Sequence, residues 1–172
     1  GGDRAVELSA PGAVAAADGG LAVIQVAGTA ILIPSGMRCV EHLLDMSVAG
    51  GDAIGQVPQG RWIVSNDAPL PAHHGGFVSG LELFDHKCFS NSSAESAAMD
   101  PQQRVMLERG YEALHGSGLT KGALQGTLCG VFVGISVNEF VALLGTIPAG
   151  QSVFAATGAS LSVASGRLSY NL

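Results

Sequence analysis

The feature that most constrains the fold is the stretch MDPQQRVMLERGYEAL at residues 99–114, which predicts a sharply bounded amphipathic helix. Asp100 is placed to cap the first turn, Pro101 has no amide to leave unpaired there, and Gln103 can reach back as in a capping box. Glycines beyond residue 115 predict the end of the helix. Apolar side chains recur between these ends at helical spacing: Met106, Leu107, Tyr111 and Leu114.

Two apolar runs rich in β-branched residues predict buried parallel strands. They are LAVIQVAGTAILI at residues 21–33 and LCGVFVGI at residues 128–135. A short helix over residues 37–46 follows the first run, and a brief helix capped by Asn138 follows the second. Strands that alternate with helices are typical of an α/β domain, and we expect that class here.

The other segments are distinguished by their small and aromatic residues. Residues 52–76 contain three prolines and four glycines, which predict an irregular segment anchored by Trp62. Residues 76–89 predict a short strand or turn that brings aromatic side chains into the core. Residues 152–172 predict a buried helix, because one stripe of it presents Leu161, Ala164, Leu168 and Leu172.

Composition predicts a protein that covers much of its surface with another chain. Of the 172 residues, 47% are hydrophobic and only 13% are charged, and the mean hydropathy is +0.37. The net charge of -6, without any cluster of Lys or Arg, predicts no nucleic-acid partner. The longest apolar tract is shorter than the roughly 20 residues that a spanning helix needs, so we expect no membrane span.

The cysteine pattern does not fix a location but favours a reducing intracellular compartment, either cytoplasm or an organelle. Cys39, Cys88 and Cys129 form no CxxC pair, which is unlike a disulfide framework or a thiolate metal site. In the second predicted strand, Cys129 is expected to be a buried, inert side chain. Residues 1–20 are rich in Gly and Ala and predict a leader or linker.

Motifs for a self-contained active site are missing from the sequence. It contains no GxGxxG, no GK[ST] loop and no HExxH, and we expect neither a cofactor nor a metal site. His73 and His74 are adjacent but have no third ligand nearby, which favours a solvated loop. Residue types alone therefore predict an α/β domain without indicating its chemistry.

Three sequence blocks together resemble the β-ketoacyl synthases, especially the ketosynthase domains of polyketide and fatty-acid synthases. The blocks are residues 51–62 (GDAIGQVPQGRW), residues 98–114 (AMDPQQRVMLERGYEAL), and residues 130–136 with 154–170 (GVFVGIS, FAATGASLSVASGRLSY). The resemblance covers residues 21–172. It implies part of a thiolase-like fold, in which two α/β halves with mixed sheets enclose buried helices. This chain is similar to most of the first half.

The resemblance implies an acyltransferase reaction that this chain does not complete by itself. Ketosynthases move an acyl group from an acyl carrier protein to a cysteine, then condense it with a malonyl unit by decarboxylation. In that family the cysteine lies shortly beyond the segment that resembles residues 154–172, and two histidines and a lysine follow later. Because thiolate and histidines are indispensable to this chemistry, we expect no catalytic residue here and no activity from the chain alone.

By the same resemblance, a few residues are candidates for an acyl tunnel or for the face toward a partner subunit: Ser136, Asn138, Phe140, Phe154 and Thr157. Plain packing is the competing interpretation of these positions.

Two functional hypotheses follow. The chain is the amino-terminal portion of a ketosynthase, or it is a non-catalytic structural subunit derived from one and buried in a larger assembly.

Overall fold

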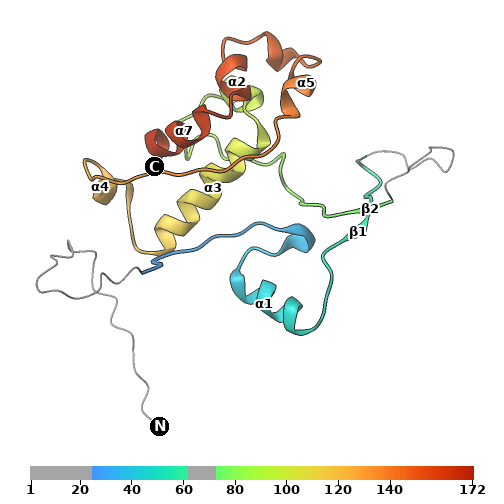
Figure 1. The fold of residues 1–172 in the computed structure, drawn as a ribbon. Coiled ribbons are helices and arrows are strands. Elements are labelled where there is room, and N and C mark those ends of the chain that lie inside the picture. Colours follow the sequence, from blue (N-terminus) through green and yellow to red (C-terminus); the bar gives the residue numbers. More distant parts are fainter. Residues whose placement is uncertain (1–24, 62–72) are drawn as a thin grey trace, which may run out of the picture.

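The computed structural model describes residues 25–61 and 73–172, in which short helices dominate (Figure 1). In chain order the elements are η1 (Pro34–Gly36), α1 (Val40–Val48), β1 (Gly55–Gln56), β2 (His74–Gly75), α2 (Ser93–Ala98), α3 (Pro101–Gly116), α4 (Lys121–Leu124), α5 (Phe140–Leu144), η2 (Pro148–Gln151), α6 (Ala155–Ala159) and α7 (Val163–Asn171). Strands β1 and β2 pair antiparallel. The predicted leader at residues 1–20 and the predicted anchor Trp62 lie outside the described residues.

Helix α3 begins and ends as its sequence predicts. The Asp100 carboxylate accepts a hydrogen bond of 2.8 Å from the backbone N–H of Gln102, and Pro101 occupies the first helical position. Ser117 follows the last turn, and Gly118 then adopts a φ of +77°, a conformation that other residues rarely take. The ends of α3 are therefore determined by local sequence.

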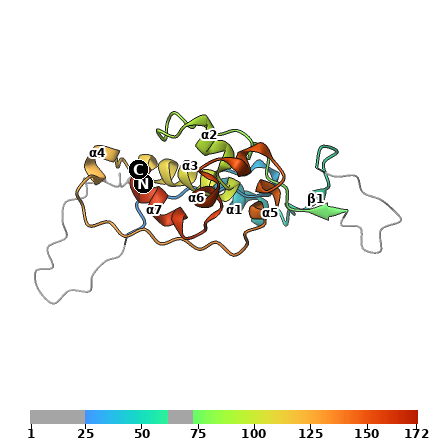
Figure 2. The same cartoon turned by 90° about the horizontal axis from the view of Figure 1, so that it is seen from above.

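Helix α7 packs along α3, and their contact builds the core (Figures 1 and 2). Its apolar stripe is confirmed, since Leu168 and Leu172 pack against the cluster of Phe89, Met99 and Leu107. The two helices approach closely at Gly110, where a Cβ atom would lie only 2.7 Å from Leu168 Cδ1. Residues 152–172 form α6 and α7 rather than the single helix predicted.

A second close approach joins α6 to the turn between α2 and α3. The backbone N–H of Asp100 donates to the carbonyl of Gly158 at 3.0 Å. A Cβ atom on Gly158 would overlap the backbone carbonyl of Ala98, so only glycine fits without moving one of the two segments. Gly158 and Ala98 are both buried.

The two predicted parallel strands are not strands in the described part of the chain. Residues 25–32 and 128–135 are unpaired, and the pair of two-residue strands β1 and β2 is the only sheet among the described residues. The prediction of a mixed sheet is therefore wrong for these residues. A β-branched run has strand propensity, but a strand forms only when a neighbouring strand satisfies its backbone groups. Here Leu128 and Phe132 are 108% and 96% exposed.

Other predicted boundaries shift by a few residues. Helix α1 covers Val40–Val48 instead of residues 37–46, because Ile33 and Met37 pair across the short η1 turn first. Residues 76–89 contain turns and no helix or strand, yet Phe89 is buried as expected.

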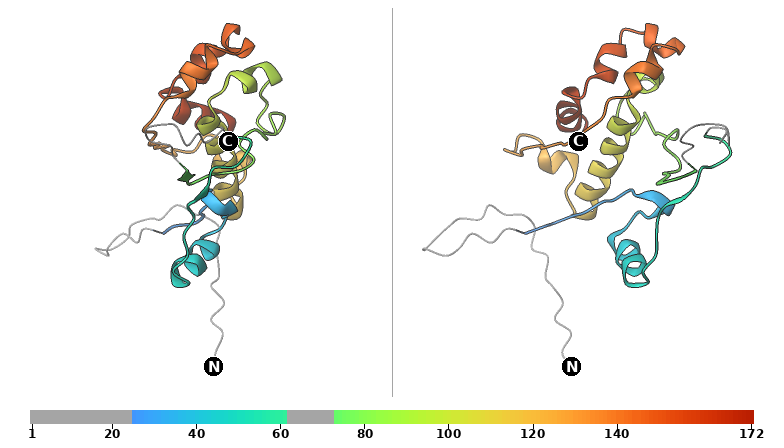
Figure 3. Two further views of the ribbon diagram at one scale, coloured as in Figure 1. Left: turned by 90° about the vertical axis from the view of Figure 1, so that its right-hand side faces the viewer. Right: turned by 45° about the vertical axis from the view of Figure 1, so that its right-hand side comes forward.

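Figure 3 shows α1 set apart from the end of the protein formed by α5, α6 and α7. Among residues 25–61 and 73–172, no helix is long and apolar enough to cross a membrane.

The close approach at Gly158 predicts a large difference between two glycine substitutions. We expect Gly158→Ala to lower the free energy of unfolding by about 1–3 kcal/mol, since the added methyl group meets backbone. Gly166→Ala is the matched control, because this exposed glycine of α7 has open space around its Cβ position. It should raise stability by about 0.5–1 kcal/mol. Urea unfolding followed by circular dichroism measures both, and equal effects would contradict the packing described.

The partly buried Glu108 of α3 predicts a pH dependence of stability. Burial raises the pKa of its carboxyl above the ordinary value of 4.5, although Arg109 acts in the opposite direction. Because the folded pKa is the higher one, stability falls as the pH rises from 4.5 through that value. Glu108→Gln should therefore stabilise the protein at neutral pH, with no gain below pH 4.5. Thermal unfolding across this range tests the sign, and Glu112→Gln, which loses an ion pair with Arg109, should show no such gain.

Candidate functional site

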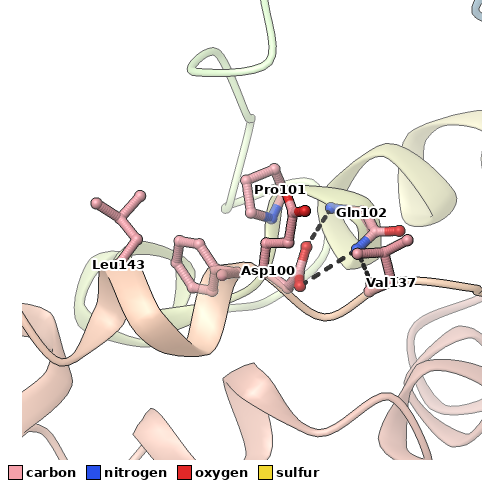
Figure 4. A pocket seen from close by; sticks show the side chains of 7 residues that line it. Asp100, Pro101, Gln102, Val137 and Leu143 are labelled. Atoms are coloured by element: carbon pink, nitrogen blue, oxygen red, sulfur yellow. Dashed lines mark hydrogen bonds between the residues drawn. The ribbon is translucent and has the colours of Figure 1, made fainter. Parts of the chain in front are cut away.

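The first turn of α3, helix α5 and the chain leading into α5 border an open, mostly apolar pocket of about 500 Å³ (Figure 4). Helix α5 presents Phe140 and Leu143 to it, and the α3 side contributes Pro101. The remaining lining residues are Asp100, Gln102, Val137 and Glu139. Apolar walls of this size suit an alkyl or aromatic group.

Polar groups at the edge of the pocket are already paired with one another. The side-chain amide of Gln102 donates to the carbonyl of Val137 at 2.8 Å and to the Asp100 carboxylate at 3.4 Å, as the dashed lines in Figure 4 mark. Asp100 is 1% exposed and also caps α3. The Gln102 amide therefore holds Val137 against the helix, and the Asp100 carboxylate, which is bonded to Gln102, is not free to act as a base.

Gln103 does not form the predicted capping box. In a capping box the backbone N–H of Asp100 would donate to the Gln103 side chain. Here that N–H donates to the carbonyl of Gly158 instead. The Gln103 amide instead reaches across to the end of α6, where it donates to the carbonyls of Gly158 at 3.0 Å and Ser160 at 2.9 Å. Its side chain is 1% exposed, so these bonds form away from water.

Arg167 of α7 completes this network. Its Nε–H donates to the Gln103 side-chain oxygen at 3.0 Å, and its guanidinium pairs with Glu95 of α2. We call Gln103, Arg167, Glu95 and the carbonyls of Gly158 and Ser160 the Gln103 clamp. Sequence reasoning missed the clamp. One signal was present: Arg167 is the only charged residue after Glu139, and a lone charge in such an apolar stretch needs partners if it is buried.

Four of the five predicted site residues lie around α5 and α6, which contact each other. Phe140 lines the pocket, and Asn138 donates to the carbonyl of Ala159 at 2.9 Å instead of capping α5. Half-buried Phe154 precedes α6, and exposed Thr157 donates to its carbonyl at 3.1 Å. Ser136 is exposed on the extended chain before the pocket and does not line it.

The arrangement can bind an apolar group but offers no nucleophile to it. None of the three cysteines lines the pocket, and Cys129 is exposed rather than buried because its segment has no strand partner. His73 and His74 are exposed. Within the described ranges, no three His, Cys, Asp or Glu side chains converge as metal ligands. What the geometry provides is a positioned apolar surface.

The order of these elements matches a known family along nearly the whole chain. The model of the "Beta-ketoacyl synthase, N-terminal domain" family matches residues 22–172. This chain belongs to the β-ketoacyl synthase family. Both the α3 motif and the Gln103 clamp lie within the matched residues of the ketosynthase sequence.

Curated relatives of this ketosynthase chain are much longer proteins. It is 37% identical to polyketide synthase GfsB of Streptomyces halstedii over 95% of this chain and 3% of that protein. It is 31% identical to a mycocerosic acid synthase-like polyketide synthase of Mycolicibacterium smegmatis over 88% of this chain and 8% of that protein. The chain thus spans only a small fraction of the length of the curated relatives it matches.

Solved ketosynthases share the fold in part. The ketosynthase from module 6 of the bacillaene synthase of Bacillus subtilis 168 matches with a TM-score of 0.70 and 29% identity, over 84% of this chain and 23% of that one. The oxazolomycin ketosynthase domain of Streptomyces albus JA3453 matches with a TM-score of 0.69 and 28% identity, over 85% of this chain and 27% of that one. This chain therefore corresponds to one portion of the thiolase-like fold.

The Gln103 clamp predicts that two adjacent glutamines differ in their effect on stability. Gln103→Met keeps the size of the side chain but removes its bonds to the carbonyls of Gly158 and Ser160 and leaves the buried Arg167 Nε–H without its partner. We expect the free energy of unfolding to fall by about 2–4 kcal/mol. Gln102→Met is the control, because Gln102 is exposed and should cost less than about 1 kcal/mol. Urea unfolding compares them, and an equal loss would contradict the clamp.

Proposed function

We propose that this chain forms the amino-terminal part of a ketosynthase domain in a polyketide synthase. The intact domain transfers an acyl group from an acyl carrier protein to a cysteine and condenses it with a malonyl unit. The observation that supports this most is the match of residues 22–172 to the family, together with the TM-score of 0.70 to a solved ketosynthase. The chain supplies architecture and one wall of the site, and the nucleophile comes from residues that this sequence does not include.

The exposed apolar runs support a place inside a larger fold. Residues 25–32 and 128–135 have the composition of strands buried on both faces, yet no strand pairs with them in the described part of the chain. We infer that in the intact domain they are strands of the ketosynthase sheet, packed against the helices of this chain. Burial of side chains as exposed as Phe132 would then contribute about 1.5–3 kcal/mol each.

The predicted site residues take a role in this proposal through the pocket. Phe140, Phe154 and Thr157, with Ser136 and Asn138 beside them, would form part of the acyl tunnel or of the face toward a partner subunit. Support comes from the apolar wall at Phe140 and from the bond between Asn138 and Ala159, which links the pocket to α6. The Gln103 clamp would hold α6 in place for this role.

A second hypothesis is a non-catalytic subunit derived from a ketosynthase and buried in a larger assembly. The exposed apolar side chains favour it as well, because Val48, Val153 and Tyr170 are more than four-fifths exposed and lie outside the two strand-like runs. Both hypotheses require additional protein to cover the exposed surface. In the first, the covering residues belong to the same protein and include the nucleophile. In the second, they belong to a different subunit.

The decisive experiment reads the transcript beyond the codon for Leu172 and assays the product that it encodes. We expect an open reading frame with a cysteine shortly after residue 172 and two histidines and a lysine further on. That longer protein should release CO₂ from a malonyl carrier protein and form the β-ketoacyl product, and replacing the new cysteine by alanine should abolish condensation.

The 172-residue chain is the control in the same assay and should form no product. Condensation by this chain alone would refute the division of roles proposed here. A stop codon after Leu172, with the protein recovered from cells in a stable complex, would instead support the structural subunit.

A further inference from the structure

A second pocket, of about 480 Å³, lies at the opposite end of α3 from the first one. It is bordered by the last turns of α3, by α4, by the carboxyl end of α7 and by the loop before α2. Figures 1 and 2 both show α4 beside the end of α7, which is marked C. The two pockets share no lining residue, so the role proposed for the first does not explain the second.

The turn after α3 builds the apolar part of this pocket. Gly118, with a φ of +77°, reverses the chain, and the backbone N–H of Leu119 donates to the carbonyl of Leu114 at 2.9 Å. Leu119 therefore returns to the side of α3. Leu124 of α4 and Leu172 of α7 complete the apolar lining, and all four leucines are half-buried. Local sequence thus determines much of the shape of the pocket.

A series of aromatic rings leads from the core into the pocket. Phe84 and Phe89 stack with their ring centres 5.2 Å apart, and Phe89 meets Tyr111 edge to face at 6.3 Å. The last pair, Tyr111 and His115, stacks at 5.6 Å. Phe89 is 4% exposed, whereas Tyr111 is 43% exposed and His115 is also exposed. A further planar ring can stack on these two rings at the usual spacing of about 4.5–7 Å.

The polar groups of the pocket favour an anion. Lys121 donates from Nζ to the carbonyl of Asn171 at 3.1 Å, which uses one of its three N–H groups. Among the residues that the structure describes, no carboxylate forms an ion pair with Lys121, and no Asp or Glu lines the pocket. The Thr120 hydroxyl accepts from the N–H of Ala123 at 3.3 Å, and its own hydrogen remains available to an anionic oxygen.

We propose that this pocket binds a planar aromatic carboxylate, whose ring stacks on Tyr111 and His115 and whose carboxylate pairs with Lys121. An alkyl chain would leave the exposed rings without a stacking partner, and a neutral ring would leave the ammonium without a counterion. The inference goes beyond the proposed function and does not depend on it, because every lining residue belongs to this chain. A ligand of about a dozen non-hydrogen atoms should bind such an open site with a dissociation constant of about 0.1–1 mM.

Titration of the isotope-labelled chain with naphthoate, followed by amide NMR spectra, tests the charge. We expect the largest shifts at amides of the lining residues. Lys121→Met should raise the dissociation constant by about fivefold or more, and Lys121→Arg should restore most of the affinity. Lys87→Met is the matched control, since Lys87 is exposed and does not line the pocket, and it should change nothing.

The neutral analogue naphthylmethanol separates the charge of Lys121 from any structural effect of its substitution. It should bind the unmodified chain about fivefold more weakly than naphthoate does, because it has no carboxylate to pair with the ammonium. Lys121→Met should leave its affinity unchanged. A substitution that merely damaged the pocket would weaken both ligands equally.

The role of the rings is tested with a ligand that has the same charge but no ring. His115→Leu keeps an apolar side chain and removes the stacking surface, so it should weaken naphthoate by about threefold or more. The same substitution should leave the affinity for octanoate unchanged. Octanoate should also bind the unmodified chain more weakly than naphthoate.

The cysteines supply an internal control for the location. Cys88 lines the pocket and Cys129 does not, and both are exposed. Saturating naphthoate should slow alkylation of Cys88 by iodoacetamide about threefold or more and leave the rate at Cys129 unchanged, as measured by peptide mass spectrometry. No amide shift at millimolar naphthoate, equal binding of the acid and the alcohol, equal binding of octanoate, or equal protection of the two cysteines would each overturn the proposal.

Discussion

The rest of the structure depends on one buried side-chain amide. Gln103 bonds to carbonyls at the end of α6 and accepts from Arg167 of α7, which pairs with Glu95 of α2. Residues that are 55 and 64 positions away from Gln103 in the chain thus bond to its side chain. Because a buried polar group without a partner is costly, all members of the Gln103 clamp must be in place together.

Local features of the fold were predictable, and features that require distant partners were not. Asp100, Pro101 and Gly118 set the ends of α3 through bonds within a few residues, and the stripe of α7 follows from helical periodicity. The strand predictions used the same kind of pattern but needed a neighbouring strand that the described chain does not provide. Gln103 appeared to be a capping residue because its true partners lie far away in sequence.

In the candidate site, too, local features were predictable and contacts between distant residues were not. Phe140, predicted as a candidate for an acyl tunnel or a subunit face, lines the pocket. The distant partners of Gln102 and Gln103 had no signal in the nearby sequence, and only the isolated charge of Arg167 indicated a buried network. A ketosynthase needs a thiolate and oxyanion-stabilising groups in addition to such a surface. The apolar composition, the exposed strand edges and the membership in the β-ketoacyl synthase family therefore have one explanation, which is that this chain is one part of a larger fold.

Native-state amide hydrogen exchange of the chain tests this account most directly. The account predicts slow exchange in α3 and at the Asp100 amide, which an ordinary helix N-cap would leave unprotected but which here donates to Gly158. Residues 128–136 should exchange at nearly the rate of an unfolded chain. Rapid exchange at Asp100, or protection of residues 128–136 equal to that of α3, would contradict a helical unit organised by Gln103 with its strands unpaired.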